Sequence, residues 1–474
     1  MKQKKLPIIF IVVCLSVCFL LGISAFFSSG DSSTEMRDVS SVPKFINEDK
    51  TINENFDSEL ADYIAVRMPV RNTLLRIKAF VFEKVFASSA AQDDVIIGKN
   101  DWYYFNETTN EYLGINLLSD RAIKNIADTV EQMQEYCQDN SMQFAFTVAP
   151  NKNTLYPDNM PSRYIRSDVN NYSRLREELK NSNVNYVDFS DLNTYSQEPL
   201  YYATDSHWNV EGAIIAYNKI LDSIGKPHED YSAVERTTGE KNGDLSRMLY
   251  PDGNVTEEES VPDYAYSFAY ASRLKSEEDI NIRTKNKNAT GSLLMFRDSF
   301  TNALLPFMAE AFGSAYFTRA IPCDMTLATD MQCDTVIYEM VQRNLENIIS
   351  FAPVMPAKIQ DFVFANCEDA EGKSEAFMRE KSETLIHIYG TVNEEYIEDD
   401  SRIYVKLRCE SGAEFIFRCF NIYEKDLYED SICRDNGYSV YIDSTVLPSE
   451  SMEVFVIIES ESDTFVSQTD LYIN

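Results

Sequence analysis

The chain has 474 residues, of which 76 are acidic and 43 are basic, so its formal net charge at pH 7 is −33. This disfavours nucleic acid as a partner, because affinity for a polyphosphate comes largely from lysine and arginine. With 44% hydrophobic and 12% aromatic residues, the chain can bury cores and is not a disordered polymer. At about 150 residues per domain, its length predicts roughly two to three domains.

Residues 6–27 contain no charged side chain and follow Lys2, Lys4 and Lys5. As a helix, this segment would span the ~30 Å hydrocarbon layer, so residues 1–27 are predicted to be a membrane anchor whose basic flank stays in the cytoplasm. The bulk of the chain would then be extracellular. The alternative is a cleaved signal peptide, with Ile23 and Ala25 as the residues of its cleavage site, which would make the protein secreted. Polar, Ser-rich residues 28–54 are predicted to form a stalk.

Nine cysteines occur in the chain, two of them within the predicted anchor. The others lack C-x-x-C spacing and have no histidine at metal-finger spacing, so a zinc site is not expected. We expect mostly buried free thiols, together with one or two disulfides at most. No cofactor is expected either.

Residues 95–368 alternate between short apolar runs and amphipathic segments. Beyond a helix at 55–86, the pattern predicts strands near 95–97, 102–105, 143–148 and 184–189, and helices at 119–138, 172–181 and 210–224. Ser119 and Asn209 are expected to cap two of these helices. Such alternation is typical of a mostly parallel sheet flanked by helices.

Residues 230–288 are polar and are predicted to loop over this sheet. The alternation then resumes, with strands at 292–296, 315–319 and 335–339 and a helix at 301–311. From residue 369 onward, short β runs follow one another without helices, which predicts a β-sandwich at 369–474.

Asp205 and His207 lie two residues apart on a predicted loop, directly before the helix at 210–224. On an extended loop, their side chains point the same way, so the carboxylate can hold the imidazole in one tautomer and stabilise its protonated form. A structural histidine bonded to an aspartate in a turn is the alternative for this pair alone.

Ser299 follows the apolar strand at 292–296 and immediately precedes a helix. This places its hydroxyl at the carboxyl edge of the sheet, where open α/β folds bind ligands, near unpaired amides of the first helical turn that can stabilise an oxyanion. A serine that merely caps the helix is the alternative. The two motifs together are more specific than either one.

Asp298-Ser299-Phe300 resembles the nucleophile block of SGNH hydrolases. The run from Thr204 to Asn209 resembles the Asp-His block of alginate O-acetyltransferase-like proteins, and residues 67–71 resemble the related DHHW family. Further resemblance lies in residues 98–102, 148–157 and 243–245. Arg297 stands where hydrolase blocks usually have glycine, so the turn needs no positive φ there.

The resemblance implies an SGNH-hydrolase-like, flavodoxin-like catalytic domain over residues 55–368. Ser299 would be the nucleophile, His207 the general base and then acid, and Asp205 the residue that orients the imidazole. Lys152, Tyr156, Trp208 and Arg297 are the candidate substrate contacts. Lys152 could instead be an exposed solubilising residue, and Trp208 could wall the site rather than pack against a sugar.

These features predict an extracytoplasmic O-acyltransferase that acetylates a secreted or cell-wall polysaccharide, in a bacterial setting. The resemblance also implies a multi-pass membrane partner that delivers the acyl group. A carbohydrate esterase with the same three residues and a non-catalytic polysaccharide-binding or scaffold protein are the alternatives. The β-sandwich is a candidate carbohydrate-binding module. Because a strongly anionic polymer would meet a repelling field, a neutral or mixed-charge glycan is favoured.

Overall fold

The structure is a computed structural model that describes residues 94–473, except 251–254, 365–366, 371, 373 and 424–434, and a few isolated positions before residue 94. The predicted anchor and stalk and most of the predicted helix at 55–86 therefore lie outside the described residues. Within the part of the chain that is described, no helix is both long and apolar enough to cross a bilayer.

A seven-stranded sheet forms the centre of the first half, in the order β4-β3-β11-β9-β10-β8-β7. The strands from β4 to β10 run parallel, whereas β8 and β7 are antiparallel. The predicted mostly parallel sheet is therefore confirmed, with an antiparallel edge. The strands are β3 (Gln143–Ala149), β4 (Tyr186–Val187), β7 (Ala269–Tyr270), β8 (Asn281–Lys285), β9 (Ser292–Phe296), β10 (Ser314–Thr318) and β11 (Thr335–Val341).

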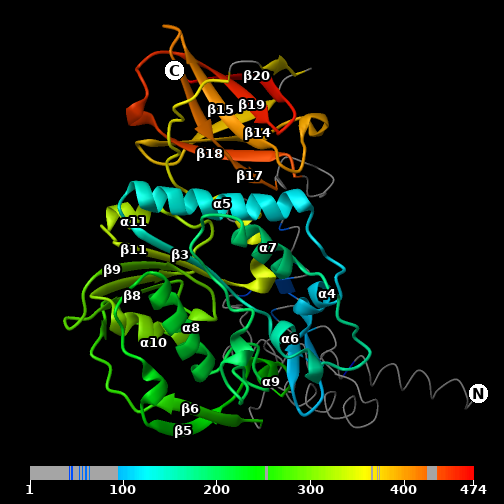
Figure 1. The fold of residues 1–474 in the computed structure, drawn as a ribbon, viewed down its shortest axis with the longest axis vertical. Coiled ribbons are helices and arrows are strands. Elements are labelled where there is room, and N and C mark those ends of the chain that lie inside the picture. Colours follow the sequence, from blue (N-terminus) through cyan, green and yellow to red (C-terminus); the bar gives the residue numbers. More distant parts are fainter. Residues whose placement is uncertain are drawn as a thin grey trace, which may run out of the picture.

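Helices cover both faces of this sheet (Figure 1). Helices α5 (Asp120–Asp139) and α7 (Asn171–Lys180) lie on one face, and α8 (Val210–Ser223) and α10 (Thr301–Ala311) on the other. The Ser119 hydroxyl accepts a hydrogen bond from the amide of Ala122 at the start of α5, and the Asn209 side chain accepts one from Gly212 in α8. Both predicted caps are therefore confirmed.

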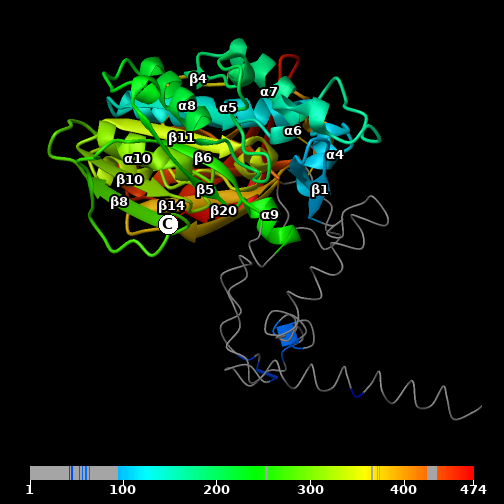
Figure 2. The same cartoon turned by 90° about the horizontal axis from the view of Figure 1, so that it is seen from below.

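The polar segment 230–288 is more regular than predicted. Strands β5 (Arg236–Lys241) and β6 (Glu257–Pro262) form a hairpin on the far side of α8 from the sheet, as Figure 2 also shows from below. Helix α9 (Asp244–Leu249) connects them, and β8 joins the central sheet. The prediction of a loop was wrong for β8. Its exposed positions carry polar residues and only Ile282 and Thr284 are buried, so the strand looks like a polar loop in the sequence.

Several shorter elements surround the sheet. The predicted strands near 95 and 103 pair with each other, and the predicted strand at 184–189 shortens to β4. The described cysteines Cys137, Cys323, Cys333, Cys367, Cys409 and Cys419 are free thiols. The shorter elements are β1 (Val95–Ile97), β2 (Tyr103–Phe105), α4 (Thr109–Tyr112), α6 (Lys152–Leu155), α11 (Thr326–Asp330) and α12 (Asn347–Ser350).

The last hundred or so residues form two β-sheets that enclose their own apolar core. One sheet has the strand order β12-β20-β19-β15-β16 and the other β13-β14-β18-β17, so the all-β prediction agrees with the structure. The strands are β12 (Glu368–Asp369), β13 (Glu375–Glu380), β14 (Leu385–Thr391), β15 (Arg402–Cys409), β16 (Glu414–Arg418), β17 (Phe420–Ile422), β18 (Gly437–Asp443), β19 (Met452–Glu459) and β20 (Thr464–Ile473).

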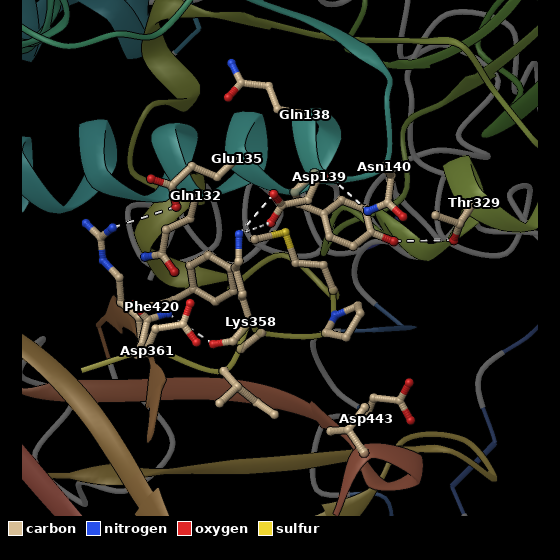
Figure 3. A pocket seen from close by; sticks show the side chains of 18 residues that line it. Gln132, Glu135, Gln138, Asp139, Asn140, Thr329, Lys358, Asp361, Phe420 and Asp443 are labelled. Atoms are coloured by element: carbon tan, nitrogen blue, oxygen red, sulfur yellow. Dashed lines mark hydrogen bonds and ion pairs between the residues drawn. The ribbon is translucent and has the colours of Figure 1, made fainter. Parts of the chain in front are cut away.

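Helix α5 lies between the central sheet and this β-sandwich (Figure 1). A cavity of about 840 Å³ opens between the end of α5, residues 355–361 and the sandwich (Figure 3). Across it, the Lys358 ammonium lies 2.9 Å from the Asp139 carboxylate. The wall residues Asn140 and Thr329 precede β3 and β11, so the cavity lies at the amino ends of these strands, opposite the edge where Ser299 was predicted.

Candidate active site

Ser299 lies in the short turn between β9 and α10, as predicted. Asp298 fixes this turn, because its carboxylate accepts hydrogen bonds from the amide of Phe300 at 2.9 Å and from the amide of Val341 at 2.6 Å. The second bond ties the turn to the end of the neighbouring strand β11. Within the described residues, the amide of Ser299 itself donates no hydrogen bond, so it remains available for an oxyanion.

His207 connects this serine to Asp205. Its Nε2 lies 2.8 Å from the Ser299 hydroxyl, and its Nδ1 lies 2.6 Å from the Asp205 carboxylate. Because an ionised carboxylate only accepts hydrogen bonds, the proton is assigned to Nδ1 and the lone pair of Nε2 faces the serine. The structure thus brings together the three predicted catalytic residues from a loop and a strand-to-helix turn. A serine, a histidine and an aspartate hydrogen-bonded in this order can carry out acyl transfer through the serine.

The charges of Asp205 and His207 stabilise each other, so the ion pair of carboxylate and imidazolium is favoured. Burial opposes the charge on His207, but the nearby Asp205 carboxylate outweighs burial, so the pKa of His207 is raised above its ordinary value. Burial likewise opposes ionisation of Asp205, yet the charge and hydrogen bonds of His207 keep the pKa of Asp205 below its ordinary value. The aspartate therefore stays charged while the imidazole takes up a proton.

Asp244 is a second carboxylate near the imidazole, with its Oδ2 3.5 Å from Nδ1 of His207. Its carboxylate accepts hydrogen bonds from the amide and the hydroxyl of Ser206, and its own amide donates to Asp205 at 3.0 Å. Asp205, His207 and Asp244 offer ligand atoms within 4.8 Å of one another. A metal ion on Nδ1 would, however, replace the hydrogen bond between His207 and Asp205.

Two further charged residues hold the loop that carries His207. Glu257, at the start of β6, accepts hydrogen bonds from the amides of Ala203 and Thr204 at 2.7 and 2.8 Å. The Lys152 ammonium donates to the carbonyl groups of Tyr103, Ala203 and Asp205 at 2.7, 2.7 and 3.0 Å. The loop is therefore clamped from both sides by hydrogen bonds to its backbone.

Lys152 consequently differs from its predicted role as a contact for donor or glycan. Its side chain is buried, and all three of its N–H groups are used by backbone carbonyls. Burial lowers the pKa of Lys152 to about 7, against the opposing charge of Asp205. It is neither a substrate contact nor an exposed solubilising residue, but a support for the Asp205 loop.

Trp208 and Arg297 also differ from the predicted substrate contacts. Trp208 is fully buried, and its indole N–H donates to the Phe300 carbonyl at 2.9 Å, so it walls the site and cannot stack on a sugar. Arg297 is buried as well and donates to the carbonyls of Glu277 and Asp279. It has no positive φ, in agreement with the prediction for the turn.

Tyr156 is half-buried beneath the same loop. Its hydroxyl accepts a hydrogen bond from the amide of Leu200 at 2.8 Å, and its ring lies 5.0 Å from that of Trp102. These contacts give Tyr156 a supporting position, and its predicted contact with substrate stays a prediction.

Asp244, Glu257 and Arg343 lie near the site but were not among the predicted site residues. Asp244 lies in one of the segments that carry the family resemblance, which was a usable signal. Glu257 belongs to the polar segment 230–288, where acidic residues are common and none is distinctive. Arg343 follows β11, and its guanidinium lies 5.8 Å from the ring of Phe300. Nothing local in the sequence marks either residue.

Comparison with known proteins gives a match in the first half of the chain. The family model for the SGNH hydrolase-like domain of the acetyltransferase AlgX matches residues 95–282. The match contains Asp205, His207 and Asp244 and ends before Ser299. The resemblance to alginate O-acetyltransferase-like proteins is therefore confirmed for this part of the chain. No curated protein sequence matches.

Several solved structures match over 53% of this chain. A DHHW family protein from Eubacterium siraeum is 19% identical, with 91% of that chain covered and a TM-score of 0.40. PatB1 from Bacillus cereus is 17% identical, with 97% covered and a TM-score of 0.42. The O-acetyltransferase domain of AlgJ from Pseudomonas putida is 14% identical, with 92% covered and a TM-score of 0.38.

Proposed function

Residues 95–282 are similar to the SGNH hydrolase-like domain of the acetyltransferase AlgX, and from this premise we propose that the protein is an O-acyltransferase with Ser299 as its nucleophile. The observation that carries the proposal is the continuous path from the Ser299 hydroxyl through His207 to Asp205, with separations of 2.8 and 2.6 Å. We further propose that it acetylates hydroxyl groups of a secreted or cell-wall polysaccharide.

The first half of the reaction forms an acyl-serine. Nε2 of His207 accepts the hydroxyl proton as Oγ of Ser299 attacks the carbonyl carbon of the acetyl donor. The amide of Ser299 stabilises the negative charge on the carbonyl oxygen of the tetrahedral intermediate. The intermediate then expels the donor group, which takes the proton from His207, and Asp205 stabilises the imidazolium while it exists.

The second half transfers the acetyl group to the acceptor. Nε2 of His207 accepts the proton of a sugar hydroxyl, whose oxygen attacks the acyl-serine carbonyl. Collapse of the second tetrahedral intermediate releases the acetylated sugar, and His207 returns the proton to Oγ of Ser299. Water in place of the sugar would make the protein an esterase.

The proposed location is the outer face of a membrane, with residues 1–27 as the anchor. The charge-free segment after a basic flank supports this placement. Acyl-coenzyme A is not expected outside the cytoplasm. The proposal therefore includes a multi-pass membrane partner that supplies the acyl group.

Hydrolysis of 4-nitrophenyl acetate by the full chain in detergent tests the serine. Ser299→Ala and His207→Ala are each expected to lower kcat/KM by about a thousandfold or more, because each removes a member of a unit that acts together. Adding an oligosaccharide acceptor should divert acetyl from acetate to acetylated sugar. Acetate as the only product would favour the esterase. Sugar binding without turnover on any ester would favour a scaffold.

The β-sandwich offers a matched control. His387 Nε2 lies 2.7 Å from the Ser439 hydroxyl, but the Arg379 side chain donates a hydrogen bond to Nδ1 at 2.9 Å. Nε2 therefore carries the proton and cannot act as a base, and burial together with Arg379 lowers the pKa of His387 to about 3. Ser439→Ala should keep full esterase activity. An equal loss in Ser299→Ala and Ser439→Ala would contradict the assignment.

A further inference from the structure

Arg343 lies next to the proposed catalytic residues but has no role in the reaction described above. It belongs to the short 3-10 turn Gln342–Asn344, which follows β11, the strand beside β9. Its guanidinium lies over the rings of Phe105 and Phe300, at 5.4 and 5.8 Å from their centres. The ring of Phe300 in turn lies 4.8 Å from that of His207. The positive charge is therefore two contacts from the imidazole of His207.

The turn that presents Arg343 is fixed on both sides. The side-chain carbonyl of Gln342 accepts hydrogen bonds from the amide of Asn151 and the hydroxyl of Thr154, both at 2.9 Å. At the strand end, Val341 donates its amide to Asp298 at 2.6 Å. Arg343 thus projects from backbone that is bonded to the nucleophile turn itself.

In the described part of the chain, the guanidinium of Arg343 has no polar partner. Among the described residues, it takes part in no hydrogen bond and no ion pair, although it is half-buried. Every other described arginine that is buried or half-buried donates to a carbonyl or carboxylate group. These are Arg121, Arg174, Arg176, Arg236, Arg247, Arg297, Arg319 and Arg418.

This exception is informative because the chain has 76 acidic residues against 43 basic ones. A half-buried guanidinium loses part of its hydration, and its fork of donors matches a carboxylate or phosphate. Two aromatic rings hold Arg343 in place without using those donors. The donors are therefore left for an anionic group that no described residue supplies.

We propose that Arg343 binds an anionic group, a carboxylate or a phosphate, on the sugar acceptor and so positions the neighbouring hydroxyl for His207. This rests on the proposed acyl transfer and adds acceptor specificity to it. A net charge of −33 repels polyanions at long range, so a single cation beside the site selects sugars with an isolated negative group over densely charged ones. The expectation of a neutral or mixed-charge glycan thereby narrows to mixed charge.

Binding to an inactive variant tests this without turnover. Titration calorimetry with full-length Ser299→Ala protein would compare a tetrasaccharide that contains one glucuronic acid, its carboxyl-reduced neutral counterpart and a monophosphorylated counterpart. At least one charged ligand should bind about tenfold more tightly than the neutral one, since charge-assisted hydrogen bonds are the strong ones. Whichever charged ligand binds more tightly shows whether Arg343 prefers a carboxylate or a phosphate. Equal binding of all three, or no binding, overturns the proposal.

Arg343→Gln, added to Ser299→Ala, should abolish the preference for charge, and Arg343→Lys should retain part of it. Arg283→Gln is the matched control, because Arg283 is exposed and lies over the ring of Tyr316 at 4.6 Å. It should keep the preference. A preference that survives Arg343→Gln overturns the proposal.

The esterase assay separates this inference from the proposed function. Arg343→Gln with Ser299 intact should hydrolyse 4-nitrophenyl acetate at a rate within about threefold of the unsubstituted protein, because this ester carries no anionic group for the arginine to bind. Both rates are measured at a pH where His207 is neutral, since loss of the guanidinium also favours the protonated form of His207. A large loss of kcat there would mean that Arg343 acts on the reacting atoms and would overturn the positioning role. Loss of activity in Ser299→Ala is measured separately and tests the serine alone.

Discussion

His207 lies among groups of opposite charge. The carboxylates of Asp205 and Asp244 favour its protonated form, whereas burial and the guanidinium of Arg343 disfavour it. The effect of the two carboxylates is the larger one, so the pKa of His207 is raised. A histidine that must accept the proton of Ser299 is then inactive at pH values where an ordinary histidine, with a pKa of about 6.5, would already be neutral.

The pH dependence of kcat/KM should show this directly. Activity should rise with pH on an acid limb whose midpoint lies above the ordinary histidine value, because the neutral imidazole is the active form. Asp244→Asn removes a negative charge 3.5 Å from Nδ1, so the limb should move to lower pH. Asp139→Asn changes the net charge equally at the opposite edge of the sheet and should leave the limb in place. A limb that Asp244→Asn does not move would contradict this account.

The residues near His207 also show what local sequence can predict. Asp205 and His207 are two positions apart, and Ser299 adjoins a strongly apolar strand, so short motifs identified all three. Lys152 looks like a surface residue in sequence, because its burial depends on the carbonyls of residues 103, 203 and 205. Contacts between segments about 50 residues apart leave no mark on a local pattern. The same holds for Arg343, which is of interest because its guanidinium has no polar partner among the residues that the structure describes.

The loop between β4 and α8 has little regular structure of its own and depends on neighbouring elements for its shape. Residues from α6, β6 and α9 each bond to its backbone, through Lys152, Glu257 and Asp244. Gly243 precedes α9 and packs so closely that a Cβ atom there would collide with the carbonyl of Thr204. The position of the Asp205 and His207 side chains therefore depends on how α9 docks against this loop.

Gly243→Ala should displace the loop without unfolding the protein. We expect kcat/KM for the aryl ester to fall by about a hundredfold, because small displacements of catalytic groups are costly, while the circular dichroism spectrum stays unchanged. Gly239→Ala in β5 is the control, since a Cβ atom there meets no other atom within 4 Å. Full activity in Gly243→Ala would show that the loop does not depend on this close packing.

Elements were predictable where one physical signal dominated. Strand β9 and helix α10 have the predicted bounds because both are strongly apolar. Strand β9 is buried on both sides, and helix α10 is buried along one face. Strand β8 was missed because it lies toward the sheet edge, where polar residues at alternate positions are tolerated. Pairing with β10, about 30 residues later in the chain, defines β8, and no local pattern contains that information.

At the scale of the whole molecule, helix α5 connects the two parts. It packs on the central sheet through one side and faces the β-sandwich with the other (Figure 1). Arg121 is buried at this boundary and donates hydrogen bonds to the carbonyls of Asp435, Glu398 and Ser401 at 3.1, 3.0 and 2.7 Å. The sequence predicted two folded parts, but not this joint, because a single arginine on an amphipathic helix resembles any solvent-exposed charge.

Arg121→Met should weaken the joint. It leaves three carbonyl groups without their donor, at about 1 to 3 kcal/mol for each that stays buried, so the sandwich should melt at a lower temperature. Differential scanning calorimetry of the full chain should then resolve the sandwich from the α/β part. Arg408→Met, which breaks an exposed ion pair with Glu453 inside the sandwich, should cost no more than about 1 kcal/mol. An unchanged thermogram for Arg121→Met would mean that the apolar contacts of α5, and not this arginine, couple the two parts.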